Sequence, residues 1–135
     1  MIKEYYIIKD KSKLQIENIK DLMKQTYWAT DRSEETIVNS IKNSVCYGIL
    51  DNCNNQVGFA RVITDYATMY YVCDVIIDKE HRGKGLGKSM IEFITEDNDS
   101  KNLYGILLTM DAHGLYEQYG FERNTEKFMH KLITM

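Results

Sequence analysis

Residues 81–89 read HRGKGLGKS and combine glycines with basic side chains at alternating positions. The residues that could do chemistry here are Arg82, Gly83, Lys84, Gly85, Gly87 and Lys88. Glycines let backbone N–H groups approach an anion closely, and a helix that begins at this point adds the positive end of its dipole. The pattern therefore predicts a phosphate-binding loop, with a solvated glycine-rich turn as the alternative.

The loop does not fit the two common nucleotide-binding motifs. A Walker A loop that ends at Gly87 and Lys88 needs its first glycine at position 82, where Arg82 stands. The dinucleotide fingerprint G-x-G-x-x-G fails as well, because Lys88 or Met90 occupies the position of the third glycine. A nucleoside triphosphatase and a dinucleotide-binding enzyme are thus disfavoured, whereas a pyrophosphate still suits the loop.

The elements around the loop follow from hydrophobic periodicity. Strand-forming residues at 45–50, 57–64 and 68–77 predict an antiparallel meander before the loop. Apolar residues at helical spacing after the loop predict a helix to about residue 97, and 103–109 then predicts a strand parallel to 68–77. The remaining expected elements are a strand at 4–8, a helix at 14–25 capped by Ser12, a helix from Ser33, a short helix at 112–119 and a final strand at 127–133.

The composition predicts one ordinary soluble domain. The 135 residues are 44% hydrophobic and 27% charged, which is enough for one core, so we expect a single domain over 1–135. The sequence has neither a membrane-spanning apolar run nor a signal peptide, which favours a cytoplasmic location. The three cysteines and three histidines lack metal-ligand spacing, so we expect no metal. A net charge of −3 disfavours binding to nucleic acid or a membrane.

Two motifs carry a resemblance to a known family. The segment 82–87 (RGKGLG) resembles the Arg/Gln-x-x-Gly-x-Gly/Ala loop of the GNAT (general N-acetyltransferase) superfamily, and 115–121 (LYEQYGF) is similar to its Leu-Tyr-x-x-x-Gly-Phe signature. The resemblance extends over about residues 45–133. It implies the mixed α/β GNAT fold: about four helices around a mixed, mostly antiparallel sheet of about six to seven strands, whose splayed parallel strands form a slot for acetyl-CoA.

The resemblance also implies which residues bind acetyl-CoA. Splayed strands leave backbone groups unpaired, so the backbone of Val75, Ile76 and Ile77 is expected to hold the pantetheine arm. The pyrophosphate is expected on the loop formed by Arg82, Gly83, Lys84, Gly85, Leu86, Gly87 and Lys88. Two departures are notable, because Thr109 replaces an asparagine that often contacts the cofactor in relatives, and Asp78 replaces a proline.

The implied reaction is direct attack of a neutral amine on the thioester in a ternary complex, which makes the protein an acyltransferase. Tyr116 stands where the family places the hydroxyl that protonates the departing thiolate, with a core tyrosine as the alternative. Asp74 stands where many relatives carry an acidic residue. It either organises a water relay to the amine or satisfies neighbouring polar groups. Cys73 is expected on the opposite face of its strand and is not expected to act as a nucleophile.

The residues of the acceptor site are less well defined. The loop between the first two helices holds the aromatic pair Tyr27 and Trp28 beside Asp31 and Arg32. It predicts a cation–π wall with an acidic anchor for an amine. The alternative is structural, with Trp28 closing the core and Arg32 pairing with Asp31 or Glu35. Arg61 is expected to line the floor of the acceptor pocket.

His113 either assists deprotonation of the amine or shares with Asp111 a capping or hydrogen-bonding role. We expect a small-molecule amine as the acceptor, with a polyamine or a protein amine as alternatives. The alternative function is a catalytically idle CoA-binding sensor of the same fold. The family also leaves a homodimer open.

Overall fold

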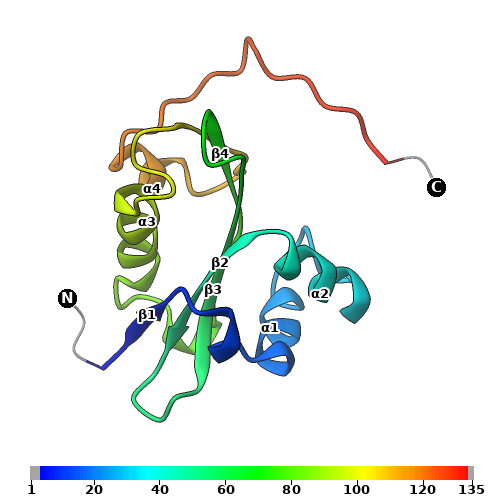
Figure 1. Ribbon diagram of the computed structural model, residues 1–135, viewed down its shortest axis with the longest axis vertical. Helices are drawn as coiled ribbons and strands as arrows, with labels where there is room; N and C mark the ends of the chain where they lie inside the picture. Colours follow the sequence, from blue (N-terminus) through cyan, green and yellow to red (C-terminus); the bar gives the residue numbers. More distant parts are fainter. Residues whose placement is uncertain (1–3, 134–135) are drawn as a thin grey trace.

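The computed structural model describes residues 4–133, which form a central five-stranded sheet with helices on both faces (Figure 1). The strands lie in the order β1-β2-β3-β4-β5, and their bounds are Tyr6–Ile8, Val45–Leu50, Gln56–Thr64, Met69–Ile77 and Tyr104–Leu107. The first four strands pair antiparallel, and β5 pairs parallel to β4. This confirms the predicted meander and the predicted parallel strand.

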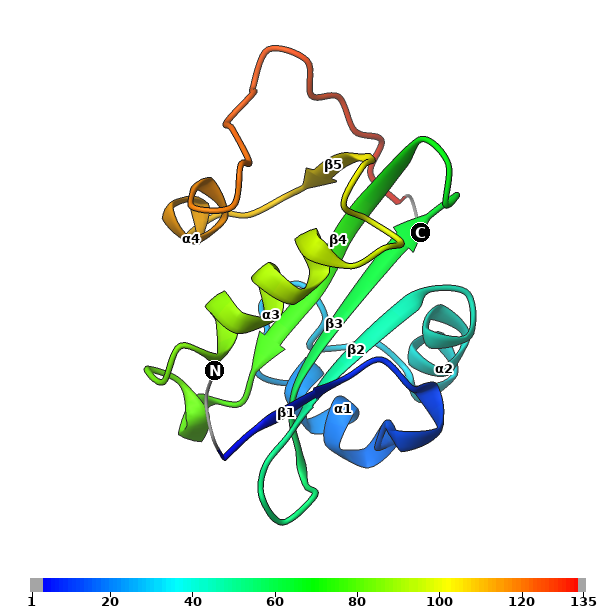
Figure 2. The same cartoon turned by 60° about the vertical axis from the view of Figure 1, so that its left-hand side comes forward.

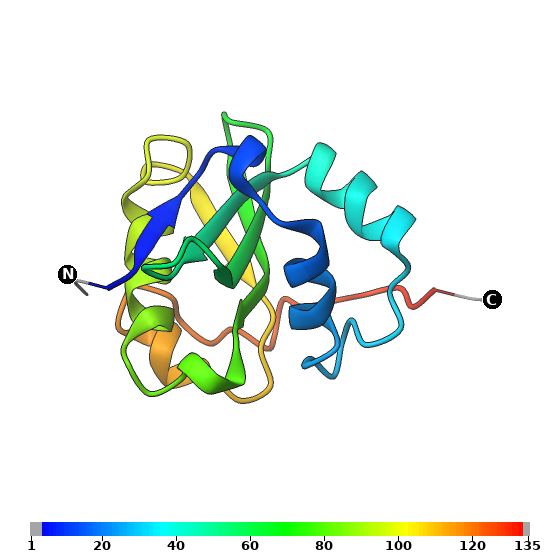
Figure 3. The same cartoon turned by 90° about the horizontal axis from the view of Figure 1, so that it is seen from below.

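Helices cover the two faces of the sheet as separate layers (Figures 1 and 3). Helices α1 (Ile16–Met23) and α2 (Glu34–Lys42) lie on one side, and α3 (Leu86–Glu96) and α4 (His113–Glu117) lie on the other. Two short 3₁₀ turns, η1 (Lys11–Lys13) and η2 (Lys79–His81), complete the elements of the described chain.

Each face of the sheet has its own hydrophobic core. Tyr47 and Met90 are fully buried between the sheet and α3. Ile19 and Phe59 are fully buried between the sheet and the layer of α1 and α2. Full burial of one such side chain contributes about 1.5–3 kcal/mol, so these two cores fix the sheet between its helical layers.

A β-bulge interrupts the pairing of β3 and β4. The register shifts between Phe59 and Arg61, where β4 contributes one extra residue. Asp74 lies at this point with a φ of 53°, in the left-handed region that aspartate tolerates better than most residues. Because the bulge breaks the strict alternation of side chains, it turns Asp74 towards Arg61 of β3.

The parallel strands β4 and β5 separate after a short paired stretch. Their pairing runs from Met69 and Tyr104 to Val72 and Leu107. Strand β4 then continues to Ile77, but β5 does not accompany it. The predicted splaying of these strands is thus present, at the end of β4 that leads into the glycine loop.

Of the predicted N-caps of the first two helices, one is confirmed and one is wrong. Ser33 caps α2 as expected, because its Oγ accepts a hydrogen bond from the N–H of Thr36 at 3.2 Å. The cap by Ser12 is wrong. Ser12 lies in η1, where its N–H donates to Asp10, and α1 begins only after Gln15. The 3₁₀ turn therefore separates Ser12 from the helix.

The predicted strand at 127–133 is wrong, and the described residues form five strands rather than six or seven. The C-terminal arm, residues 122–133, is exposed and contains no helix or strand. Figures 1 and 2 show that it arches over the body after α4, and in Figure 1 it then runs away from the body. A strand needs a neighbouring edge for its backbone hydrogen bonds, and the arm lies beside none within the described chain.

Candidate active site

The glycine loop has the conformation that its glycines allow. Gly83 and Gly85 have φ angles of 81° and 80°, which are strained for any residue with a side chain. Helix α3 begins directly after Gly85, and no side chain caps its N-terminus. The first backbone N–H groups of α3 therefore lack a side-chain acceptor, as an anion site at a helix N-terminus requires.

Basic side chains also anchor the loop to the body. The Nε of Arg82 donates to the carbonyl oxygen of Ile77 at 2.9 Å, which ties the loop to the end of β4. Lys84 Nζ donates to the hydroxyl of Tyr5 at 3.1 Å, and this hydrogen bond raises the pKa of Lys84. The Tyr5 hydroxyl also lies 2.9 Å from His81 Nδ1. Tyr5 is thus a loop-holding residue that no local sequence motif marked.

Tyr116 lies in α4 and is one of the buried residues of the core on the α3 side. It is 9% exposed, and its ring packs edge-on against Phe121 at a centroid distance of 5.9 Å. Burial, with a contribution from Asp111, raises the pKa of Tyr116 to about 12. At neutral pH its hydroxyl is therefore protonated and able to donate a hydrogen bond.

Asp74 is the centre of a buried polar network. One carboxylate oxygen accepts from Trp28 Nε1 at 2.9 Å, and the other accepts from Arg32 Nη1 at 2.7 Å and from Arg61 Nε at 2.8 Å. Burial alone would raise the pKa of Asp74, but the hydrogen bonds and the positive charges outweigh it and lower that pKa. Arg61 also donates through Nη1 to Ser44 Oγ at 3.1 Å.

The network unites four predicted site residues that lie far apart in the sequence. Trp28, Arg32, Arg61 and Asp74 were expected to have separate roles in the acceptor pocket and in catalysis, but here the first three all bond to Asp74. The alternative that Arg32 pairs with a neighbouring acid is wrong, because its ion pair is with Asp74. Strand alternation could not predict the contacts of Asp74, because the bulge interrupts that alternation.

Cys73 does not lie where the alternation placed it. It pairs with Arg61 across β3 and β4, and neighbouring residues of such a pair share one face. Cys73 is therefore on the same face as the Asp74 network, which corrects the predicted opposite face. Burial raises the pKa of the Cys73 thiol to about 11, so the thiol stays protonated.

The segment before α4 has a different hydrogen bond from the one expected. The N–H of Ala112 donates to Thr109 Oγ1 at 3.0 Å. His113 is the first residue of α4 and is half-buried. Within residues 4–133 neither His113 nor Asp111 makes a side-chain hydrogen bond, so Thr109 organises this turn instead.

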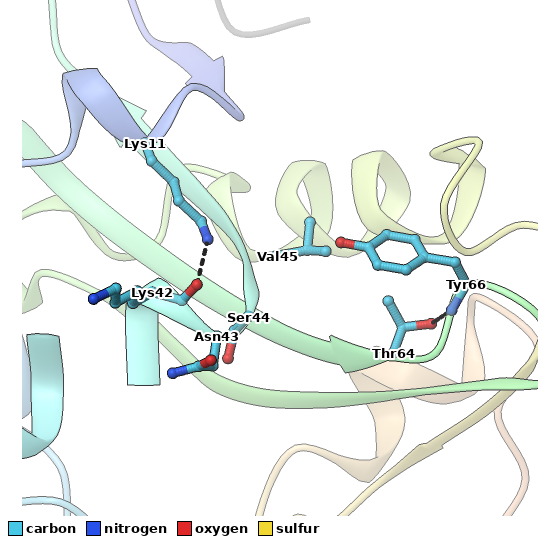
Figure 4. Close-up of a pocket in the computed structure, with 7 residues that line it drawn as sticks. All are labelled: Lys11, Lys42, Asn43, Ser44, Val45, Thr64 and Tyr66. Carbon is cyan, nitrogen blue, oxygen red and sulfur yellow. Dashed lines mark hydrogen bonds between the residues drawn. The ribbon is translucent and has the colours of Figure 1, made fainter. Parts of the chain in front are cut away.

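A polar hollow of about 210 Å³ lies where β2 begins and β3 ends (Figure 4). It is lined by Lys11, Lys42, Asn43, Ser44, Val45, Thr64 and Tyr66, none of which is a predicted site residue. In the same described range, no helix has the length and apolarity to cross a membrane, and no three potential ligands gather into a metal site.

Comparisons with known proteins agree on one family. The family model "Acetyltransferase (GNAT) domain" matches residues 42–123. A crystal structure from Xanthomonas campestris pv. campestris, described as an acetyltransferase of the GNAT family, is 36% identical. It covers 96% of this chain and 93% of its own, with a TM-score of 0.89. This likeness confirms the predicted GNAT fold.

Two curated relatives match shorter parts of the chain. An acetyltransferase from Gibberella zeae is 27% identical over 112 residues, which are 69% of this chain and 63% of its own length. The glucosamine 6-phosphate N-acetyltransferase of Trypanosoma brucei brucei is 38% identical over 53 residues, which are 38% of this chain and 36% of its own length. The chain thus spans less than two thirds of the length of these relatives. Since the family model matches more than half of the chain, the protein belongs to the GNAT family of acetyltransferases.

Proposed function

We propose that residues 1–135 act as one N-acetyltransferase domain, which moves an acetyl group from acetyl-CoA to an amine by direct attack in a ternary complex. The observation that carries this proposal is the separation of β4 from β5 beside the uncapped N-terminus of α3. The first feature offers unpaired backbone groups to amides, and the second offers N–H groups to a phosphate. The unpaired backbone groups suit the pantetheine arm of a CoA molecule, and the N–H groups suit its pyrophosphate.

The fit can be assigned to particular residues. The backbone of Val75, Ile76 and Ile77 lies beyond the last pair with β5 and would hold the pantetheine arm. The loop from Arg82 to Lys88 would hold the pyrophosphate, and a Cβ at Gly83 would have no atom within 4 Å, so the loop is open on that side. Bound acetyl-CoA supplies an activated thioester, and the protein supplies orientation and protons.

Tyr116 is the residue that we assign to proton transfer. Its hydroxyl is protonated at neutral pH and would donate to the sulfur as the thiolate departs. Asp74 suits a positioning role better than that of a base, because its carboxylate already accepts three hydrogen bonds and its pKa is lowered. His113, at the start of α4, is the side chain that would receive the proton of the amine.

We propose a small-molecule amine as the acceptor. The relative from Trypanosoma brucei brucei is named for an amino-sugar phosphate, which is an example of a small acceptor. Trp28 is exposed beside Tyr27, with ring centroids 4.9 Å apart, and the two rings would form one wall of the acceptor site. The second candidate function is a CoA-binding sensor, which needs the glycine loop but not the hydroxyl of Tyr116.

Two measurements on the same samples test the proposal. Calorimetry should show that CoA binds to the wild type and to Tyr116→Phe with similar affinity. A thiol-release assay with acetyl-CoA and a panel of amines should then show turnover that is much slower in Tyr116→Phe. Binding without turnover of any amine would favour the sensor, and absence of CoA binding would overturn both functions.

A homodimer is also part of the proposal, because the described chain leaves two apolar surfaces without cover. Phe128, Met129, Leu132 and Ile133 of the C-terminal arm are between 49% and 93% exposed, and Tyr104, Ile106, Leu108 and Met110 in and after β5 are between 38% and 75% exposed. An arm from a second copy could pair with the free edge of β5 and cover this row. Light scattering should give the mass of a dimer for the wild type and of a monomer for Leu132→Asp, whereas Lys127→Asp should remain dimeric.

A further inference from the structure

We propose that the amine acceptor also carries an anionic group, a carboxylate or a phosphate, and that Arg32 and Arg61 bind this group. The inference rests on the proposed function, because it concerns the acceptor of that reaction. It is carried by the charges and the free hydrogen-bond donors of the Asp74 network, which would be unusual if that network were only a structural ion pair.

The network contains more positive than negative charge. Arg32 Nη1 and Arg61 Nε lie 2.7 Å and 2.8 Å from the same oxygen of Asp74. Within residues 4–133 no second carboxylate lies within ion-pair distance of either arginine. Two guanidinium groups therefore share one carboxylate, and one positive charge is left without a partner.

The two arginines also keep unused donors. A guanidinium group has five N–H donors in a rigid fork that matches a carboxylate or a phosphate. Arg32 uses only Nη1, for Asp74 and more weakly for Met23 Sδ at 3.8 Å, and Arg61 uses Nε and Nη1. Their side chains are 21% and 13% exposed, and none of their nitrogens is among the buried atoms without a partner in the described residues, so the remaining N–H groups are open to a ligand. Groups in such a position are stabilised by an acceptor.

The network lies where an acceptor must arrive. Asp74 directly precedes Val75, which begins the stretch assigned to the pantetheine arm. Trp28 and Arg32 bring the loop between α1 and α2 to the same point, on the face of the sheet opposite to α3 and α4 (Figure 1). An anion on the arginines would place a nearby amine at the thioester end of the slot, while Tyr116 belongs to the core on the other face.

The unpaired positive charge also selects against acceptors that carry no anion. The same charge repels a polyamine or a lysine-rich peptide, which carry no anion to offset it. The network thus favours amino acids, amino-sugar phosphates and related compounds over purely cationic amines.

Two matched pairs of amines test this inference, one for each anion. The first pair is an amino acid and its primary amide, and the second is glucosamine 6-phosphate and glucosamine. We expect kcat/KM to be at least about tenfold higher for the anionic member of at least one pair, the value of one charge-assisted hydrogen bond. Which pair shows the preference identifies the anion.

Arg32→Gln provides the decisive variant, because it leaves one arginine and one carboxylate and so makes the network neutral. It should lower kcat/KM for the anionic member much more than for the neutral member and so reduce the preference, whereas Arg32→Lys should restore part of the preference. Arg123→Gln is the matched control, since Arg123 is exposed and its ion pair is with Glu117, outside the network. An equal loss for both members of a pair, or a preference for the neutral member, would overturn the inference.

Calorimetry with the same amines separates this inference from the proposed function. Tighter binding of the anionic member to the wild type than to Arg32→Gln supports the arginine site even if no acetyl group is transferred. Turnover of amines with equal binding of both members in the wild type supports the acetyltransferase and rejects the anion site.

Discussion

The two sites that meet at β4 are made from different parts of the protein. The glycine loop offers backbone N–H groups, with two glycines in the left-handed region and a helix that begins without a side-chain cap. The network around Asp74 offers side chains, which come from the loop before α2, from β3 and from the bulge in β4. One site is continuous in the sequence, and the other is assembled by the fold.

This difference determines which property of each site a substitution can change. A loop that binds through its backbone recognises a phosphate and tolerates many side chains, as long as the glycines remain. A network of side chains can change its charge through a single substitution. The proposed cofactor site is therefore suited to being shared among relatives, whereas the proposed acceptor site is suited to setting which amine is used.

Asp74→Asn should cause the largest effect on stability. The asparagine would leave Arg32 and Arg61 as two largely buried charges without a counter-ion, and removal of one partner from a buried ion pair costs about 3–5 kcal/mol. Urea unfolding should show this loss in the free energy of unfolding. Glu34→Gln is the matched control, because Glu34 pairs with Lys20 at 2.8 Å on the surface and should contribute at most about 1 kcal/mol. Equal losses of unfolding free energy in the two variants would mean that the buried network stabilises the protein no more than a surface ion pair does.

Two substitutions at Gly85 should separate the two properties of the loop. Gly85→Ala introduces only the strain of a left-handed φ, which costs about 1–2 kcal/mol, and Gly85→Glu adds a negative charge where the pyrophosphate is proposed. We expect Kd for CoA to rise more than about a hundredfold in Gly85→Glu and about tenfold or less in Gly85→Ala. Calorimetry of both variants checks this. Similar affinities for the two would show that the loop does not bind an anion.

The same contrast explains how much the sequence could predict. The helix after the glycine loop, the cap at Ser33 and the parallel β5 follow from local residue patterns, and each is confirmed. The ion-pair partner of Arg32 does not follow from a local pattern, because it depends on a bulge that changes the direction of the Asp74 side chain. The role of Tyr5 depends on a contact with Lys84 on a distant part of the chain.

The C-terminal arm shows a further limit of local patterns. Residues 127–133 have the composition of a strand, but composition describes only how well a segment would fit an edge. Whether an edge is within reach depends on the path of the chain after α4, which leads away from the body of the molecule (Figure 1).

Tyr116→Phe should have a smaller effect, confined to the chemical step. Loss of the hydroxyl removes the donor assigned to the departing thiolate, so kcat should fall about tenfold to a hundredfold while the affinity for CoA stays the same. Steady-state thiol release and calorimetry measure the two quantities. Tyr119→Phe is the control, because Tyr119 is a partly buried packing residue of the same core. A fall in kcat that is equal in both variants would remove Tyr116 from the mechanism.

The smallest effect concerns acid, and it should distinguish the side-chain network from the backbone loop. The folded protein lowers the pKa of Asp74, so the carboxylate contributes stability above its unfolded pKa of about 3.9, and this contribution is lost as the pH falls through the folded pKa. Protonated Asp74 resembles asparagine. The difference in the free energy of unfolding between wild type and Asp74→Asn should therefore become smaller as the pH falls below about 4. The corresponding difference between wild type and Gly85→Ala should stay constant, because that substitution alters no titrating carboxylate. Urea unfolding at several pH values measures both differences. If the difference for Asp74→Asn were independent of pH, Asp74 would stabilise the protein through its shape rather than through its charge.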